Sequence, residues 1–147
     1  MITYFDTSVV MGLFDPNQVI YENVTKIFLA AQKQGTVVTT TLHTYSELYN
    51  NLSKKGGGRP GLLPKDVAEL LVQRFGKIFT LVELASVDYE SAVIRCGQLN
   101  IPGPVIYDAL HYQAALKAGA DVLYTDNLKD FTRLQLPDDQ LEVKGVR

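Results

Sequence analysis

The chain has 147 residues, of which 46% are hydrophobic and 20% charged, and its formal net charge is −2. This length and composition are typical of one globular domain with a single sizeable core, so we expect residues 1–147 to form one domain. The near-neutral balance excludes a chain that is drawn to nucleic acid by its overall charge. Any such contact has to come from a local basic patch or from a bound metal.

Cysteine content and hydropathy set further limits. The one cysteine, Cys96, excludes an internal disulfide and fits a reducing compartment, and two histidines with this cysteine are too few for a typical zinc cage. No apolar run approaches the roughly 18 residues of a membrane span, and the first residues lack the basic region and cleavage site of a signal peptide. We therefore expect a cytoplasmic protein without a membrane partner. The composition still allows a site in which carboxylates bind a hard metal ion.

The chain begins with a β-branched and aromatic run that ends on a carboxylate. Residues 2–5 predict a first strand, and Asp6, Thr7 and Ser8 follow it directly. Ligands of open α/β sheets bind outside the carboxyl ends of the strands, so Asp6 is well placed for chemistry. An aspartate before hydroxyl residues is also a common helix N-cap, and this structural alternative stays open for Asp6 on its own.

Helical periodicity follows between turn signals. After a short apolar segment at 8–14 and a turn at 15–17, apolar residues recur at helical spacing over 19–31, with Gly35 as the stop signal. The β-branched residues 36–40 predict a second strand. Strand, helix and strand within about forty residues imply a right-handed parallel crossover.

The next region combines an acid with a basic loop. The sequence Thr44-Tyr45-Ser46-Glu47 matches a capping box, which gives Glu47 a structural alternative to a role in a site. The predicted helix then runs into a glycine-rich stretch, which is the most basic part of the chain and lacks the Gly-Lys-Ser/Thr ending of a P-loop. Its cations are either part of a solvated loop or a clamp on phosphates, and the candidates are Lys54, Lys55 and Arg59.

The second half of the chain continues the alternation. Pro64 begins a predicted helix, residues 78–84 predict a strand, and Ser86 is expected to cap a helix in which Cys96 is a small core residue. Residues 101–104 break that helix.

Two more acids follow in this half. Asp108 heads the next predicted helix, and His111 lies one turn further on, where a partly buried or surface histidine is favoured over one that touches the same site. Residues 121–125 predict a strand that Asp126 follows, just as an acid follows the first strand. Residues 141–146 predict the last strand.

Strands that alternate with helices predict a three-layer α/β/α fold with a central parallel sheet of about five strands. In such a sheet Asp6 and Asp126 lie at one edge, and Glu47 and Asp108 occupy first turns of helices that begin at that edge. Four crowded carboxylates repel one another unless they are protonated or bind a cation, so we expect Mg²⁺ or Mn²⁺ there. Such an ion lowers the pKa of a bound water and neutralises phosphate oxygens, which suits hydrolysis of a phosphodiester. The neighbouring hydroxyls that we expect to hold these carboxylates or waters are Thr7, Ser8 and Thr125.

The ordered set of motifs resembles a PIN domain. The motifs are Phe5-Asp6-Thr7-Ser8-Val9-Val10, Glu47, Tyr107-Asp108-Ala109-Leu110-His111 with Ala114-Ala115, and Leu123-Tyr124-Thr125-Asp126-Asn127-Leu128-Lys129-Asp130-Phe131. The match spans nearly the whole chain and is similar to VapC-type toxins of toxin–antitoxin pairs. The resemblance implies a Mg²⁺- or Mn²⁺-dependent endoribonuclease that forms a homodimer and is silenced by a cognate antitoxin.

The resemblance also implies roles for individual residues. Asp6 and Asp108 would be the principal metal ligands, and Glu47 and Asp126 would complete the catalytic site. Related sequences often carry an acid or amide at the next positions, so the alternatives to Asp126 are Asn127 and Asp130. The composition of the basic loop, and not the resemblance, makes Lys54, Lys55 and Arg59 the candidates for contact with RNA.

Other functions are compatible with parts of the pattern. A PIN nuclease of RNA processing, or a non-catalytic module that binds RNA or protein, would use the same scaffold. A phosphoacceptor domain normally has paired acids after its first strand, whereas Thr7 and Ser8 follow Asp6 here. The same three residues depart from the Asp-x-Asp motif of dehalogenase-like phosphatases.

Overall fold

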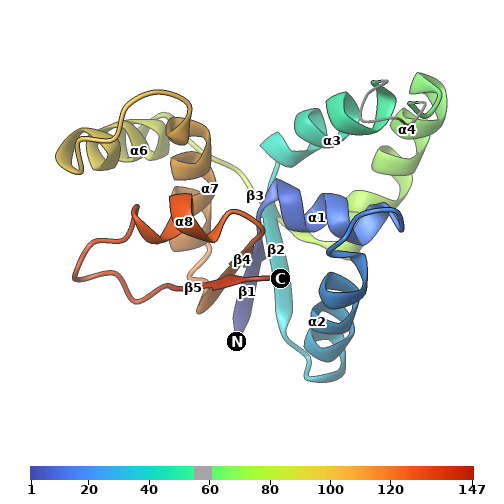
Figure 1. The fold of residues 1–147 in the computed structure, drawn as a ribbon, viewed down its shortest axis with the longest axis horizontal. Coiled ribbons are helices and arrows are strands. Elements are labelled where there is room, and N and C mark those ends of the chain that lie inside the picture. Colours follow the sequence, from blue (N-terminus) through green and yellow to red (C-terminus); the bar gives the residue numbers. More distant parts are fainter. Residues whose placement is uncertain (55–60) are drawn as a thin grey trace.

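A five-stranded parallel sheet forms the centre of the computed structural model, which describes residues 1–54 and 61–147 (Figure 1). The strands are β1 (Ile2–Phe5), β2 (Val37–Thr41), β3 (Thr80–Val82), β4 (Val122–Thr125) and β5 (Glu142–Gly145). Their spatial order is β3-β2-β1-β4-β5, and each neighbouring pair is parallel. The predicted parallel sheet of about five strands is confirmed.

Helices cover both faces of this sheet, as Figure 1 shows. They are α1 (Thr7–Phe14), α2 (Tyr21–Lys33), α3 (His43–Ser53), α4 (Pro64–Leu70), the π-helical segment η1 (Leu71–Phe75), α5 (Gly76–Ile78), α6 (Ser86–Gln98), α7 (Val105–Lys117) and α8 (Leu128–Thr132). One hydrophobic cluster packs helices α1, α2, α3 and α4 against one face of the sheet. A second cluster packs α6, α7 and α8 against the other face. The predicted three-layer α/β/α architecture is therefore confirmed.

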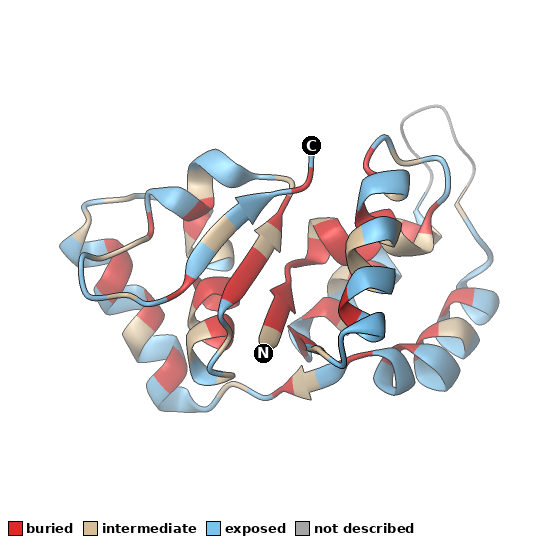
Figure 2. Ribbon diagram, turned by 90° about the horizontal axis from the view of Figure 1, so that it is seen from below, coloured by how far each residue is buried: buried red, intermediate tan, exposed pale blue. Residues whose placement is uncertain are grey.

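The core is divided by the sheet because alternate residues of a strand point to opposite faces. Phe5 packs in the cluster of α1 and α2 with Val9 and Val24, whereas Tyr4 packs in the cluster of α7 with Ala109. Both aromatic residues of β1 are 0% exposed. The central strands are accordingly red in Figure 2, as expected for a parallel sheet that is covered on both faces.

Helix starts differ slightly from those predicted. Helix α7 begins at Val105, so Asp108 lies in its first turn and does not head it. Ser86 is the first residue of α6 and not its cap; the side chain of Asp88 accepts a hydrogen bond from the backbone N–H of Ala85 at 2.7 Å. The backbone N–H groups of Asp88 and Tyr89, which a Ser86 cap would have served, donate instead to the carbonyl of Ala85 at 3.0 Å and 3.3 Å.

The strand order reverses between β1 and β4. From β1 the chain moves outward through β2 to β3, and then returns through α7 to β4 on the other side of β1. In open parallel sheets the ligand crevice forms at the carboxyl ends of the two strands that flank such a reversal. Asp6 directly follows β1 and Asp126 directly follows β4, so residues from the two ends of the sequence meet at this edge.

Two smaller predictions concern Cys96 and membrane spans. Cys96 is a free, buried cysteine in the cluster around α7, as predicted for a small core residue. Among the helices of the described residues, none is both long and apolar enough to cross a bilayer.

Candidate active site

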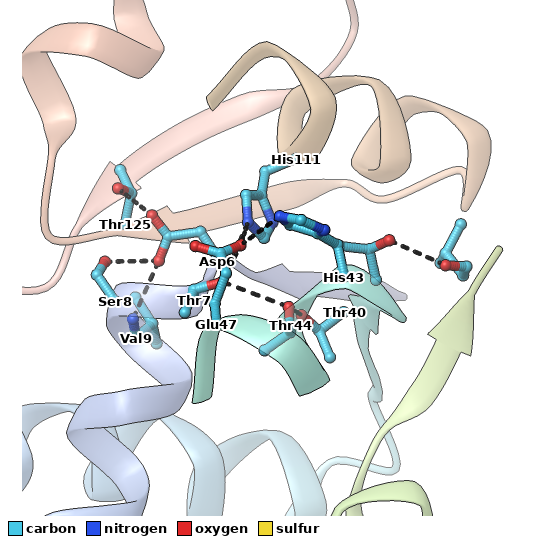
Figure 3. Close-up of polar contacts among 12 residues, drawn as sticks. Asp6, Thr7, Ser8, Val9, Thr40, His43, Thr44, Glu47, His111 and Thr125 are labelled. Atoms are coloured by element: carbon cyan, nitrogen blue, oxygen red, sulfur yellow. Dashed lines mark hydrogen bonds and ion pairs between the residues drawn. The ribbon is translucent and has the colours of Figure 1, made fainter. Parts of the chain in front are cut away.

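A cavity of about 260 Å³ lies at the carboxyl edge of the sheet, beside the reversal. Its lining residues come from the end of β1 and from α1, α3, α7 and the segment after β4, and they are Asp6, Thr7, Ser8, Glu47, Asn51, Tyr107, Asp108, His111 and Asn127. Three of the four predicted acids therefore share one cavity. Figure 3 shows two of them, Asp6 and Glu47, side by side with His111.

Asp6 is held at both of its carboxylate oxygens. The Ser8 hydroxyl and the backbone N–H of Val9 donate to Oδ1 at 2.6 Å and 3.0 Å, and the Thr125 hydroxyl donates to Oδ2 at 2.6 Å (Figure 3). The bond from Val9 also makes Asp6 the N-cap of α1, so capping and site geometry coincide in one residue. Burial raises the pKa of Asp6, although these hydrogen bonds oppose the shift. The side chain has a fixed orientation and 4% exposure.

Glu47 reaches the cavity from α3 and does not close the predicted capping box. Thr44, the expected partner, lies inside the helix, and its hydroxyl shares a hydrogen bond with that of Thr40 at 3.0 Å. The Oε1 atom of Glu47 accepts instead from the Thr7 hydroxyl at 2.9 Å and lies 3.0 Å from Nε2 of His111. Burial alone would raise the pKa of Glu47, but these two partners hold it below its usual value.

Asp108 lines the cavity from the first turn of α7 and is partly exposed. Burial and the negative charges of Asp6, Asp130 and Glu47 raise its pKa to about 6. Burial is the largest cause, and the neighbouring acids add repulsion that a cation bound among them would relieve.

The donor set fits a hard divalent cation. Carboxylate and amide oxygens and water are the ligands that Mg²⁺ and Mn²⁺ prefer, and the cavity presents Asp6, Glu47, Asp108 and the amide of Asn127. Within residues 1–54 and 61–147, no three Asp, Glu, His or Cys side chains lie close enough together to coordinate one ion. The arrangement therefore suits an ion that is held by one or two carboxylates and keeps several waters, which is the usual coordination of Mg²⁺ in proteins.

Asp126 lies beside this cavity and not in its wall. Its carboxylate accepts two hydrogen bonds from the Arg147 guanidinium, at 2.7 Å from Nε and 3.1 Å from Nη2. It lines a neighbouring cavity of about 270 Å³ together with Ser8, Asn51 and Lys54. The two cavities share Ser8 and Asn51, so Asp126 is close to the candidate site but paired elsewhere.

The two predicted alternatives to Asp126 lie next to Asp108. The amide of Asn127 donates to the Asp130 carboxylate at 2.7 Å and to the Asp108 carboxylate at 3.4 Å. Asn127 lines the candidate site, and Asp130 is one of the charges that raise the pKa of Asp108. The structure therefore brings Asn127 and Asp130 together with the other acids.

One of the three predicted phosphate-binding cations can be placed. Lys54 is exposed at the end of α3 and lines the neighbouring cavity. Lys55 and Arg59 lie outside the described residues.

His111 is buried and lines the cavity, so the favoured interpretation of it as a partly buried or surface histidine is wrong. It is 4% exposed, and its ring lies between the Tyr4 hydroxyl, 2.7 Å from Nδ1, and the Glu47 carboxylate. The one signal in the sequence was its spacing of a single helical turn from Asp108. Asn51 and Tyr107 also line the cavity, and neither was predicted as a site residue, although Tyr107 belongs to one of the motifs of the PIN resemblance.

We expect Asp108→Asn to stabilise the cation-free protein at pH 7.5 by about 1 kcal/mol. A carboxyl whose folded pKa is raised favours folding below its unfolded pKa, near 4, and loses that contribution as the pH rises through about 6. The neutral amide removes the repulsion, and the partial exposure of Asp108 reduces the effect through solvent screening. Urea unfolding in a chelator, at pH 4 and at pH 7.5, measures the difference.

The control for this substitution is Asp138→Asn, because Asp138 is an exposed residue outside the cavity. A lower stability of Asp108→Asn than of wild type at pH 7.5 would contradict the electrostatic picture. Equal gains at both pH values would also contradict it.

An all-parallel α/β/α sheet with acids at the ends of β1 and β4 and on the flanking helices defines a class of protein whose ligand site is an acidic crevice at the strand reversal. The family model of the PIN domain matches residues 3–135. The chain therefore belongs to the PIN domain family, as its motifs predicted.

Solved structures share this fold over almost the whole chain. VapBC2 from Rickettsia felis, bound to a DNA fragment from its promoter, is 17% identical, with a TM-score of 0.67 over 99% of this chain and 98% of that chain. VapC20 of Mycobacterium tuberculosis, a sarcin-ricin loop cleaving toxin, is 14% identical, with a TM-score of 0.69 over 88% and 93%. FitAcB from Neisseria gonorrhoeae is 15% identical, with a TM-score of 0.67 over 97% and 96%. A search of curated proteins by sequence gives no match.

Proposed function

We propose that the chain is a Mg²⁺- or Mn²⁺-dependent endoribonuclease, the toxin of a VapBC-type pair, which hydrolyses RNA phosphodiester bonds. The observation that carries this proposal is the meeting of Asp6, Glu47 and Asp108 in one cavity, where burial and the neighbouring negative charges raise the pKa of Asp108 to about 6. The similar folds of a sarcin-ricin loop cleaving toxin and of toxin–antitoxin complexes support the same function.

Asp6 and Asp108 are the proposed principal ligands of the cation. The bound cation would supply a water of lowered pKa and would neutralise charge on a phosphate. The hydrogen bonds from Ser8 and Thr125 fix Asp6, so that its lone pairs have a set direction before a cation arrives. In the described part of the chain the hydrogen bonds to Glu47 fall on Oε1, so Oε2 is available to the cation or to a water.

Asp130, together with Asn127, is the proposed fourth polar group of the site. Asp130 adds negative charge near Asp108, and Asn127 links the two acids by its amide. Asp126 is the weaker candidate because its carboxylate is already paired with Arg147.

The neighbouring cavity is the proposed path for RNA next to the cleavage point. It shares Ser8 and Asn51 with the site and carries the cation of Lys54, which suits a flanking phosphate. Lys55 and Arg59 stay predictions for the same role.

The proposed partners are a cognate antitoxin and a second copy of the chain, and the proposed location is the cytoplasm. Folds similar to this one occur in solved VapBC and FitAB complexes, which supports an antitoxin partner. If the chain is a toxin, its expression in a bacterium will stop growth, and expression of the protein encoded next to it will restore growth. A PIN nuclease of RNA processing would cut RNA without this pattern of arrest and rescue.

The direct test uses purified protein, total bacterial RNA and a chelator. We expect cleavage with Mg²⁺ or Mn²⁺, none with the chelator alone, and recovery when the cation is returned. RNA that stays intact with either cation would reject the nuclease and would favour a non-catalytic binding module.

We expect Ser8→Ala and Thr125→Val each to weaken Mn²⁺ binding by about 10- to 100-fold, because groups that orient a metal ligand have effects of this size. Each substitution removes one of the 2.6 Å hydrogen bonds to Asp6. Titration calorimetry with Mn²⁺ measures the affinity. The matched control is Thr132→Val, because the Thr132 hydroxyl donates only to carbonyls of its own helix, α8, in the described hydrogen bonds. Mn²⁺ affinities of Ser8→Ala and Thr125→Val within twofold of wild type would contradict the prediction.

A further inference from the structure

A buried tyrosine and a buried histidine connect the core of the protein to Glu47. The Tyr4 hydroxyl lies 2.7 Å from Nδ1 of His111, and Nε2 of the same ring lies 3.0 Å from Oε1 of Glu47. Tyr4 is 0% exposed and His111 is 4% exposed, and their rings meet edge to face with centroids 6.0 Å apart. The chain of contacts runs from the central strand β1 through α7 to α3 (Figure 3 shows its His111–Glu47 end).

The partners of His111 determine its tautomer. An ionised carboxylate only accepts hydrogen bonds, so the ring proton that faces Glu47 is on Nε2. The Thr7 hydroxyl gives its own proton to the same Oε1 atom, so it is an acceptor toward Nε2, 3.1 Å away. A neutral imidazole with its proton on Nε2 has an acceptor at Nδ1, and the Tyr4 hydroxyl donates to it. Every hydrogen bond in the chain of contacts therefore points toward Glu47.

The burial of the Tyr4 hydroxyl and the His111 ring favours a positioning role over simple packing. Buried hydroxyls and ring nitrogens need hydrogen-bond partners, and apolar side chains of similar size would fill the same space without that need. Here the hydroxyl of Tyr4 orients the His111 ring, and the ring holds Glu47, whose described hydrogen bonds all come from side chains. His43 approaches the same Glu47 oxygen from an exposed position, but only to 3.6 Å.

We propose that Tyr4 and His111 are positioning residues that hold Oε1 of Glu47 against the cavity wall and leave its other oxygen for the cation or a water. This inference rests on the proposed function, and it assigns a role to two core residues that act beside the Thr7 hydroxyl on the same oxygen of Glu47. Tyr4 acts through His111, and His111 acts through Glu47.

The test compares Mn²⁺ affinities of wild type and five variants by titration calorimetry. We expect His111→Leu to bind about 10- to 100-fold more weakly, and Tyr4→Phe about 3- to 10-fold more weakly, as outer-shell partners of a metal ligand do. We expect His111→Gln to recover most of the lost affinity because its amide again offers an N–H to Glu47. The controls are His43→Leu and Tyr112→Phe, which remove an exposed histidine near Glu47 and a buried tyrosine hydroxyl that bonds to Asp139; we expect both to bind as wild type does.

A second measurement reads the tautomer directly. Nitrogen NMR of ¹⁵N-histidine protein in a chelator is expected to show His111 with its proton on Nε2, and a shift toward a mixture of tautomers in Tyr4→Phe. A proton on Nδ1 in the wild type would overturn the proposal whatever the affinities are. This readout needs the folded chain alone, so it is independent of cleavage.

The outcomes separate this inference from the proposed function. If the wild type binds Mn²⁺ and cuts RNA but Tyr4→Phe and folded His111→Leu bind Mn²⁺ equally well, the inference fails and the nuclease stands. If the wild type neither binds Mn²⁺ nor cuts RNA, both fail.

Discussion

Asp6→Asn is expected to reduce cation-dependent RNA cleavage by at least about 10³-fold, because a bound metal contributes several kcal/mol to stabilising the transition state. Asp6 is the acid that the structure fixes most completely, with a donor on each oxygen at 2.6 Å. An amide in its place keeps the shape and loses the charge that the cation needs. Single-turnover cleavage of a defined RNA at saturating Mg²⁺ measures the loss.

The fold should survive this substitution, which makes the result interpretable. The amide oxygen of asparagine can still accept from the backbone N–H of Val9 and so still cap α1. Burial already raises the pKa of Asp6, so a neutral group removes an unfavourable charge from the cation-free protein. We expect a thermal midpoint equal to or above that of wild type in a chelator. Undiminished cleavage by Asp6→Asn, or an equal loss in Asp138→Asn at the exposed position outside the cavity, would reject the assigned role.

The fold and the places of Asp6 and Asp108 at one edge of the sheet could be predicted from the sequence, because both depend on local strand and helix patterns. The β-branched run that ends on Asp6, with two hydroxyl residues after it, marks a strand end wherever the chain goes afterwards. The alternation of strands and helices then places Asp6 and the first turn of α7 at one edge of the sheet. Asp108 lines the cavity for the same reason.

What the sequence did not predict depends on contacts between distant residues. Beyond the end of β4 the two-residue period stops, so the sequence does not tell whether Asp126 or Asn127 turns its side chain into the cavity. His111 lies 107 positions from Tyr4 and 64 from Glu47, and helical spacing gives its face but not its neighbours. The capping box at Glu47 failed because α3 begins at His43, one residue before the threonine that the motif treats as the cap.

A cluster far from the cavity holds the segment between α8 and β5. Oδ2 of Asp139 accepts from Nη1 of Arg95 at 2.7 Å, from the Tyr112 hydroxyl at 2.8 Å and from the backbone N–H of Leu136 at 2.8 Å. Nη1 of Arg95 also donates to the carbonyl of Leu134 at 2.9 Å, and the guanidinium lies 4.7 Å from the centroid of the Tyr112 ring. The side chains of Arg95 and Asp139 are 10% and 11% exposed, so this ion pair is largely but not fully buried.

We expect Asp139→Ala to lower the free energy of unfolding by about 3–5 kcal/mol, because it leaves the Arg95 charge buried without its partner. For a chain of this size that is about 10–20 °C in thermal midpoint. Calorimetry or urea unfolding at pH 7.5 measures the loss, with Asp138→Ala at the neighbouring exposed position as the control. Asp139 lines neither of the two cavities at the carboxyl edge of the sheet, so Mn²⁺ affinity measured well below the midpoint should stay that of wild type.

The pH dependence and a double substitution test the cause of this loss. Burial alone would raise the pKa of Asp139, but its bonds with Arg95, Leu136 and Tyr112 hold it below the usual value. An acid with a lowered folded pKa stabilises the fold above its unfolded pKa and loses that contribution as the pH falls through the folded value. The difference between wild type and Asp139→Ala should therefore shrink as the pH falls below about 4. If the unpaired charge is the cause, adding Arg95→Met to Asp139→Ala will recover part of the lost stability. If the double variant instead loses the sum of the two single losses, the two side chains act independently and this explanation is wrong.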